Sequence, residues 1–133
     1  MGTAAIPALA GLRLLVVEDE YMVAEHIGML LEDFGCGLAG PVGTIEEALA
    51  AVRAGGLDGA LLDANLGGES SGPVAVALLA ASVPFVVVTG YGACDLPGEA
   101  LNRAPRLTKP FSTAEFERTL VAALAPRVFG PAD

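Results

Sequence analysis

Residues 12–20 read LRLLVVEDE, an apolar run that is broken by one arginine and stops abruptly at three consecutive acids. Such a run is typical of a central strand in a parallel sheet, because helices cover both faces of that strand. From Tyr21 to Phe34 apolar residues recur at helical spacing, and Gly35 follows as a C-terminal stop signal. The stretch therefore predicts a β-strand followed directly by an α-helix, with carboxylates at their junction.

The same alternation of strand and helix continues along the rest of the chain. Short apolar or β-branched runs predict four further strands, over residues 37–39, 58–63, 84–89 and 106–108. Helical patterns predict helices over residues 44–53, over residues 73–81, and from residue 112 to about residue 125, before Pro126. Five strands that alternate with helices favour parallel pairing with right-handed crossovers. The expected fold is α/β, a doubly wound five-stranded parallel sheet with helices on both faces.

Capping patterns support two of these helices, and one connection departs from the regular pattern. Thr44 with Glu47, and Ser112 with Glu115, have the spacing of a capping box. Residues 93–104 contain a proline and a glycine and show little helical periodicity. We expect at most a short, mobile helix in that segment.

The length and composition of the chain fit one domain. With 133 residues, 53% of them hydrophobic, the chain can bury a proper core. We predict a domain over residues 12–125, preceded by a flexible tail over residues 1–11 and followed by a tail over residues 126–133.

Charge and composition argue against several kinds of partner. A net charge of -9 with only seven basic residues disfavours nucleic-acid binding. No apolar run reaches the roughly 20 residues of a membrane span, and the basic start of a secretory signal is missing, so we expect a cytoplasmic protein without membrane contact. Cys36 and Cys94 lack CxxC spacing and His26 has no second ligand nearby, so we expect reduced thiols and a plain helix residue.

Polar residues follow the predicted strands at the points where the strands end. They are Glu18 and Asp19 after the first strand, Asp63 after the third, Thr89 after the fourth and Lys109 after the fifth. Doubly wound sheets bind their ligands beyond the carboxyl ends of the strands. We therefore expect these five side chains to share one crevice.

Three carboxylates in one crevice repel one another and need a compensating cation. Oxygen ligands favour Mg²⁺, which keeps several waters and readily shares a phosphate oxygen. Asp63 can then attack phosphorus and form an acyl phosphate, while Lys109 and the Thr89 hydroxyl contact phosphoryl oxygens. Taken singly, each residue also has an ordinary explanation, as a helix N-cap, a strand-end residue or a solvated surface cation.

The order of these residues resembles that of response-regulator receiver domains, from Leu12 to Leu124. The resemblance implies a flavodoxin-like sheet of order 2-1-3-4-5, and a signalling domain that catalyses only its own phosphotransfer and dephosphorylation. It implies that Asp63 accepts a phosphoryl group from a histidine kinase or a histidine phosphotransfer protein, with Mg²⁺ as the cofactor. The implied metal ligands are Glu18, Asp19, Asp63 and the backbone carbonyl of Asn65. Thr89 and Lys109 match the family's phosphate-contacting hydroxyl and lysine, and the family's peptide before Pro110 is usually cis.

Two positions depart from the common receiver pattern. Most receivers carry a signalling Tyr or Phe where this chain has Arg106, and an arginine is not buried there without a charge partner. Residues 84–91, PFVVVTGY, resemble instead a receiver subgroup with a PFxFATGY motif. By that resemblance Tyr91 takes over part of the aromatic's role, although a partly exposed loop residue is an equal alternative. Glu18 stands where Asp is commoner, and its longer side chain still reaches a metal through a water.

Several alternatives share the fold or the chemistry. The chain could serve as a phosphate sink or shuttle, or be the receiver segment of a hybrid histidine kinase, and we expect a monomer or weak dimer. A phosphatase that forms an aspartyl phosphate usually needs a second carboxylate as general acid, where this chain has Asn65. A flavin-binding protein is disfavoured because the acids after the first strand would repel a phosphate.

Overall fold

The computed structural model describes residues 6–90 and 96–129, with residues 125–129 described by their backbone alone. Seven strands and five helices lie within this part of the chain. The strands are β1 (Arg13–Val17), β2 (Gly37–Val42), β3 (Gly59–Asp63), β4 (Asn65–Leu66), β5 (Glu69–Ser70), β6 (Phe85–Thr89) and β7 (Arg106–Thr108). The helices are α1 (Tyr21–Asp33), α2 (Ile45–Ala54), α3 (Gly72–Ala80), α4 (Glu99–Arg103) and α5 (Thr113–Phe129).

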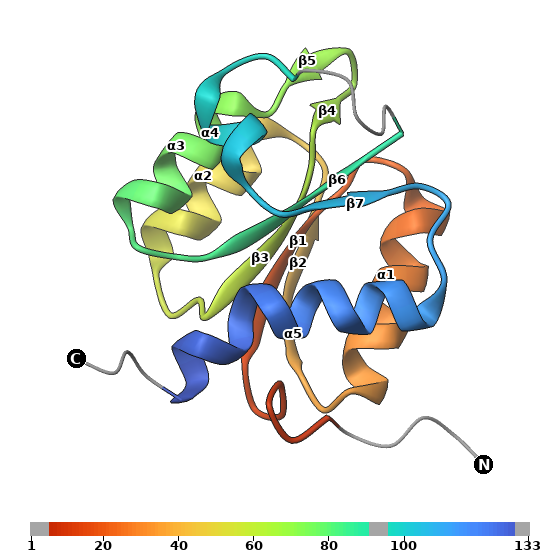
Figure 1. The fold of residues 1–133 in the computed structure, drawn as a ribbon. Coiled ribbons are helices and arrows are strands. Elements are labelled where there is room, and N and C mark those ends of the chain that lie inside the picture. The colour runs from red at the N-terminus through yellow and green to blue at the C-terminus, as the bar shows by residue number, and fades with distance from the viewer. Residues whose placement is uncertain (1–5, 91–95, 130–133) are drawn as a thin grey trace.

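Five of the strands form one parallel sheet in the order β2-β1-β3-β6-β7 (Figure 1). Since β6 and β7 are the fourth and fifth strands of this sheet along the chain, the predicted order 2-1-3-4-5 is confirmed. The strand order reverses between β1 and β3, and such a switch point is where ligands of doubly wound sheets bind.

Helices cover both faces of the sheet, with α1 and α5 on one side and α2, α3 and α4 on the other (Figure 1). Side chains of β1 alternate between the two resulting cores: Leu15 and Val17 pack with α2 and α3, whereas Leu14 and Val16 pack with α1 and α5. Both faces of the strand are therefore buried, which explains why its sequence is apolar without alternation. None of the helices among the described residues combines the length and apolar character of a bilayer-spanning segment.

The helix caps follow the predicted patterns. The Thr44 hydroxyl accepts a hydrogen bond from the Glu47 N–H at 3.1 Å, and the Glu47 carboxylate accepts one from the Gly43 N–H at 3.1 Å. At the start of α5 the two bonds are fully reciprocal: the Ser112 hydroxyl accepts from the Glu115 N–H at 3.0 Å, and the Glu115 carboxylate accepts from the Ser112 N–H at 2.9 Å. Both helices thus begin where side chains satisfy backbone donors that have no partner inside the helix.

The prediction of a loose N-terminal tail is wrong for residues 6–11. Leu9 is fully buried in the core beneath α1 and α5, and Ile6 packs against the same core. The N–H groups of Ile6 and Gly11 donate to the carbonyls of Phe34 and Gly35, at 3.0 and 2.9 Å. The segment folds back because a small domain gains stability from any apolar side chain that it can still bury.

The predicted end of the last helix, at about residue 125, is also wrong. Helix α5 continues through Pro126 to Phe129 instead of stopping at residue 125. A proline inside a helix removes one backbone hydrogen bond and crowds the preceding turn, but only three helical residues follow Pro126 before α5 ends at Phe129.

The segment before β7 contains the short helix that its sequence suggested, and that helix has firmer anchors than expected. Leu96 and Leu101 are buried, the latter completely. The Asn102 side chain closes the turn, because its Oδ1 accepts from the Leu96 N–H at 2.8 Å and its Nδ2 donates to the carbonyls of Leu96 and Gly98. The extent of α4 is thus confirmed, and its mobility stays a prediction.

The buried thiol of Cys36 makes the stability of the fold depend on pH in the alkaline range. The thiol is buried and contacts the carbonyl of Leu9 at 3.5 Å, and burial raises its pKa from 9.0 to about 11. Because the unfolded chain loses this proton first, the thiol's contribution to stability is complete below pH 9 and is lost as the pH rises toward 11. Urea unfolding over this range should show the wild type losing about 2 kcal/mol more than Cys36→Ala. Parallel stability curves for the two proteins would contradict this assignment.

Candidate functional site

Acidic side chains gather at the carboxyl edge of the sheet, next to the switch point. Glu18 and Asp19 follow β1, and Asp63 is the last residue of the neighbouring strand β3. One carboxylate oxygen from each of these residues lies within 4.8 Å of those of the other two. The three predicted acids therefore come together as expected, although Asp63 lies 44 residues after Asp19 in the sequence (63 − 19).

Lys109 lies among these acids. Its Nζ is 3.3 Å from Glu18 Oε1, 3.4 Å from Asp63 Oδ2 and 3.4 Å from Glu20 Oε1. The residue follows β7, where its N–H donates to the Thr89 carbonyl at 2.8 Å, and the Lys109-Pro110 peptide is cis. It is also the one lysine in the sequence, so the ammonium that faces these carboxylates has no equivalent elsewhere in the chain.

Burial disfavours the charged form of the Glu18 carboxyl group. The residue is only 4% exposed, and desolvation first, then a hydrogen bond to Asp63, raise its pKa from 4.5 to about 7. Burial by itself would lower the pKa of Lys109, but the charges of Asp63 and Glu18 outweigh it and raise that pKa. Among the described side chains, Glu18 Oε1 stands out as buried without a hydrogen bond, although the ammonium is near. A carboxylate oxygen in this condition is suited to a second cation.

A small hairpin after β3 fixes the position of Asp63 and Asp19. Strands β4 and β5 pair antiparallel across Gly67 and Gly68, which both have the positive φ that a tight two-residue hairpin turn requires. The Gly67 N–H donates to Asp19 Oδ2 at 2.9 Å. The Asn65 N–H donates to Asp63 Oδ1 at 3.1 Å, and the Ser71 hydroxyl donates to the Asp63 carbonyl at 2.6 Å.

Sequence reasoning missed three parts of this arrangement: the hairpin, the Ser71 anchor and the Glu20 contact with Lys109. The consecutive glycines at 67 and 68 were a usable signal, because Gly-Gly between short extended segments is a hairpin pattern. No motif in the sequence predicts the contact of Ser71 with Asp63 or that of Glu20 with Lys109, because both contacts depend on how the chain packs.

The remaining predicted residues take different positions. Thr89 is buried at the end of β6, directly beside the strand that ends in Asp63. Arg106 begins β7 and is partly buried, and its Nη2 donates to Asn102 Oδ1 at 3.3 Å. It therefore lies at the far end of its strand from Lys109, against α4. Pro110 is exposed, and Tyr91 lies outside the described residues.

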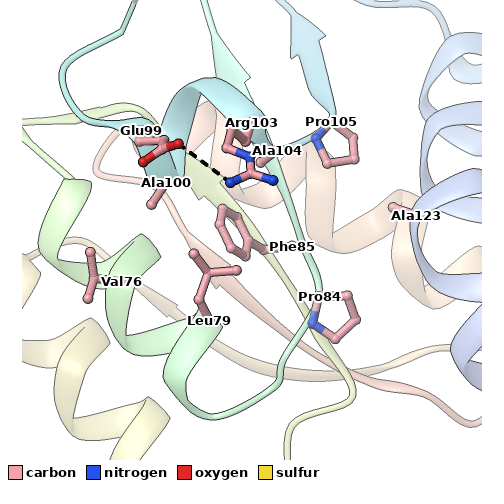
Figure 2. Close-up of a pocket in the computed structure, with 10 residues that line it drawn as sticks. All are labelled: Val76, Leu79, Pro84, Phe85, Glu99, Ala100, Arg103, Ala104, Pro105 and Ala123. Carbon is pink, nitrogen blue, oxygen red and sulfur yellow. Dashed lines mark hydrogen bonds and ion pairs between the residues drawn. The ribbon is translucent and has the colours of Figure 1, made fainter.

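A second concave feature lies away from the acids. An apolar groove of about 660 Å³ lies between α3, α4 and the start of β6. Figure 2 shows residues that line it, with Leu79 and Phe85 among them. The ion pair of Glu99 with Arg103, 3.5 Å long and highly exposed, crosses its rim. Because Phe85 begins the strand that ends at Thr89, the groove and the acidic site lie at opposite ends of β6.

Comparison with known proteins gives several matches, although no family model matches the sequence. SdrG from Sphingomonas melonis Fr1 is 41% identical over 86% of this chain and 96% of that chain, with a TM-score of 0.73. A CheY-like response regulator receiver domain from Methylobacillus flagellatus is 28% identical, with a TM-score of 0.72, over 85% and 98% of the two chains.

A longer protein is similar as well. The phyllosphere-induced regulator PhyR of Methylorubrum extorquens is 32% identical over 114 residues, which make up 84% of this chain and 43% of that regulator. At the level of fold, the receiver domain of the Pseudomonas aeruginosa sensor histidine kinase PA1611 has a TM-score of 0.72 at 24% identity, over 86% and 98% of the two chains. That crystal structure has a magnesium ion in its active-site cleft.

The flavodoxin-like sheet, with acids and a lysine at its carboxyl edge, has the arrangement of a receiver signalling domain. The chain belongs to the response-regulator receiver family of two-component systems. Receivers in general interact with histidine kinases or phosphotransfer proteins. The predicted class of partner is therefore confirmed for the family as a whole.

Proposed function

We propose that this receiver accepts a phosphoryl group on Asp63 from the phosphohistidine of a histidine kinase or a histidine phosphotransfer protein, with Mg²⁺ as cofactor. One observation carries the proposal: the Asp63 carboxylate lies within 4.8 Å of two further carboxylates and 3.4 Å from the one lysine of the chain. A nucleophilic carboxylate, an oxygen-rich cation site and a fixed ammonium are the groups that phosphoryl transfer to aspartate requires.

The donors present fit Mg²⁺. They are carboxylate oxygens of Glu18, Asp19 and Asp63, and Mg²⁺ prefers oxygen ligands of this kind. The resemblance to other receivers adds the backbone carbonyl of Asn65 as a fourth ligand. The buried Glu18 oxygen without a hydrogen bond supports a cation on that side of the site. When bound, the ion would reduce the repulsion between these carboxylates and an incoming phosphoryl dianion.

The chain's own groups account for the remaining requirements. An Asp63 carboxylate oxygen forms a bond to phosphorus while the bond from phosphorus to the histidine nitrogen of the donor breaks, and the imidazole leaves with that electron pair. Lys109 exchanges a carboxylate partner for a phosphoryl oxygen, and the Thr89 hydroxyl donates to another. Attack by a carboxylate oxygen releases no proton from the nucleophile, so the reaction needs no general base.

Incubation with acetyl phosphate tests the proposal without a cognate kinase. We expect intact-protein mass spectrometry to show one added phosphoryl group in the presence of Mg²⁺ and none after chelation with EDTA. Hydroxylamine should remove the group, since it cleaves acyl phosphates and leaves phosphate esters of serine or threonine intact. An adduct that resists hydroxylamine, or one that forms equally well in EDTA, would exclude a Mg²⁺-dependent aspartyl phosphate.

A further inference from the structure

Glu20 holds the outer side of Lys109. It is the last residue before α1, and no hydrogen bond from its side chain caps that helix. Its Oε1 lies 3.4 Å from Lys109 Nζ, and its side chain is 65% exposed, against 1% for Glu18 and 9% for Asp63. The ammonium therefore has two buried carboxylate partners and one partner in solvent.

The solvent side is where a phosphoryl donor must approach. Glu18 and Asp63 are buried, so an incoming phosphoryl group reaches the ammonium from the side on which Glu20 lies. When a divalent cation balances the charges of Glu18 and Asp63, Glu20 becomes the remaining carboxylate partner of Lys109 among the described residues. The Glu20 carboxylate and a phosphoryl oxygen then compete for the same ammonium.

We propose that Glu20 is a positioning residue for Lys109: it holds the ammonium at the mouth of the site until a phosphoryl oxygen displaces it, and so slows phosphorylation by small donors. The inference rests on the proposed function. The backbone N–H of Glu20 donates to Glu18 Oε2 at 3.1 Å. This bond holds the backbone of Glu20 beside the acids and does not depend on the Glu20 carboxylate. Replacing the carboxylate by an amide thus removes the competing charge and leaves the backbone in place.

The test compares Glu20→Gln with Glu25→Gln at saturating Mg²⁺. Glu25 is an exposed acid on α1 whose carboxylate accepts from the Tyr21 hydroxyl at 3.3 Å, and within residues 6–90 and 96–129 it makes no hydrogen bond or ion pair with the site, so it controls for the loss of one negative charge. We expect Glu20→Gln to be phosphorylated by acetyl phosphate about two- to fivefold faster than wild type, the range that breaking one exposed ion pair allows, and Glu25→Gln to match wild type.

A second readout reports on Lys109 directly. Because the chain has one lysine, protein labelled with ¹³C-lysine gives a single ε-methylene NMR signal. In the Mg²⁺-loaded, unphosphorylated state this signal should move in Glu20→Gln and stay in place in Glu25→Gln. An unmoved signal, or equal rates for Glu20→Gln and wild type, would overturn the inference while leaving Asp63 phosphorylation intact. Absence of labelling in every protein would instead contradict the proposed function, and the inference with it.

Discussion

Asp63→Asn is expected to remain unphosphorylated under conditions that label the wild type completely. An amide oxygen is a poor nucleophile and cannot form a stable acyl phosphate, and the substitution also removes one of the three carboxylates of the proposed Mg²⁺ site. The mass spectrum after incubation with acetyl phosphate and Mg²⁺ should show no added phosphoryl group. Beryllofluoride with Mg²⁺ should likewise leave the variant's NMR spectrum unchanged.

The fold should survive this substitution. The Ser71 hydroxyl on the Asp63 backbone carbonyl stays in place, and an asparagine oxygen can still accept the Asn65 N–H. The contact of Oδ2 with Lys109 is weakened, but that ammonium keeps Glu18 and Glu20 as partners. Asp58→Asn is the matched control, because Asp58 accepts the Arg13 N–H at 2.9 Å beyond the opposite end of β3. Full labelling of Asp63→Asn, or loss of labelling in Asp58→Asn, would show that the phosphoacceptor lies elsewhere.

Lys109→Met is expected to have two effects of opposite sign. Phosphorylation by acetyl phosphate should slow about 100-fold or more, the usual cost of removing a group that stabilises developing charge in a transition state. Mg²⁺ affinity should rise by at least about tenfold, because the ammonium lies 3.3–3.4 Å from Glu18 and Asp63 and repels a cation there. Methionine keeps most of the length and volume of the aliphatic stem, so the change is mainly one of charge.

Calorimetric titration with Mg²⁺ and the labelling rate measured together make the Lys109 prediction specific. A variant that is merely misfolded would lose both activities, whereas the structure requires one to fall and the other to rise. Arg53→Met controls for the loss of one positive charge, since Arg53 is exposed in the last turn of α2. A lower Mg²⁺ affinity in Lys109→Met would mean that the ammonium does not compete with the cation.

The order of elements and most of the site could be predicted because they depend on local patterns. Apolar runs, helical periodicity and capping boxes describe neighbours in sequence, and the acids, threonine and lysine each stand at the end of a strand or directly after it. Once five strands are placed side by side and parallel, their carboxyl ends meet at one edge. The receiver pattern at residues 18, 19, 63, 89 and 109 was therefore readable without coordinates.

The packing of Leu9, the hairpin over residues 65–70, the contact of Arg106 with Asn102 and the contact of Lys109 with Glu20 could not be predicted in this way. Glu20 and Lys109 are 89 residues apart, and no pattern in either segment states that their side chains meet.

The sequence by itself therefore determined which chemical groups stand at the strand ends. The tertiary structure alone decided which carboxylates contact Lys109, and how deeply each of these charged groups is buried. The reason is physical. Propensity and periodicity act over a few neighbouring residues, whereas burial and ion pairing depend on segments that are distant in sequence and that packing brings together.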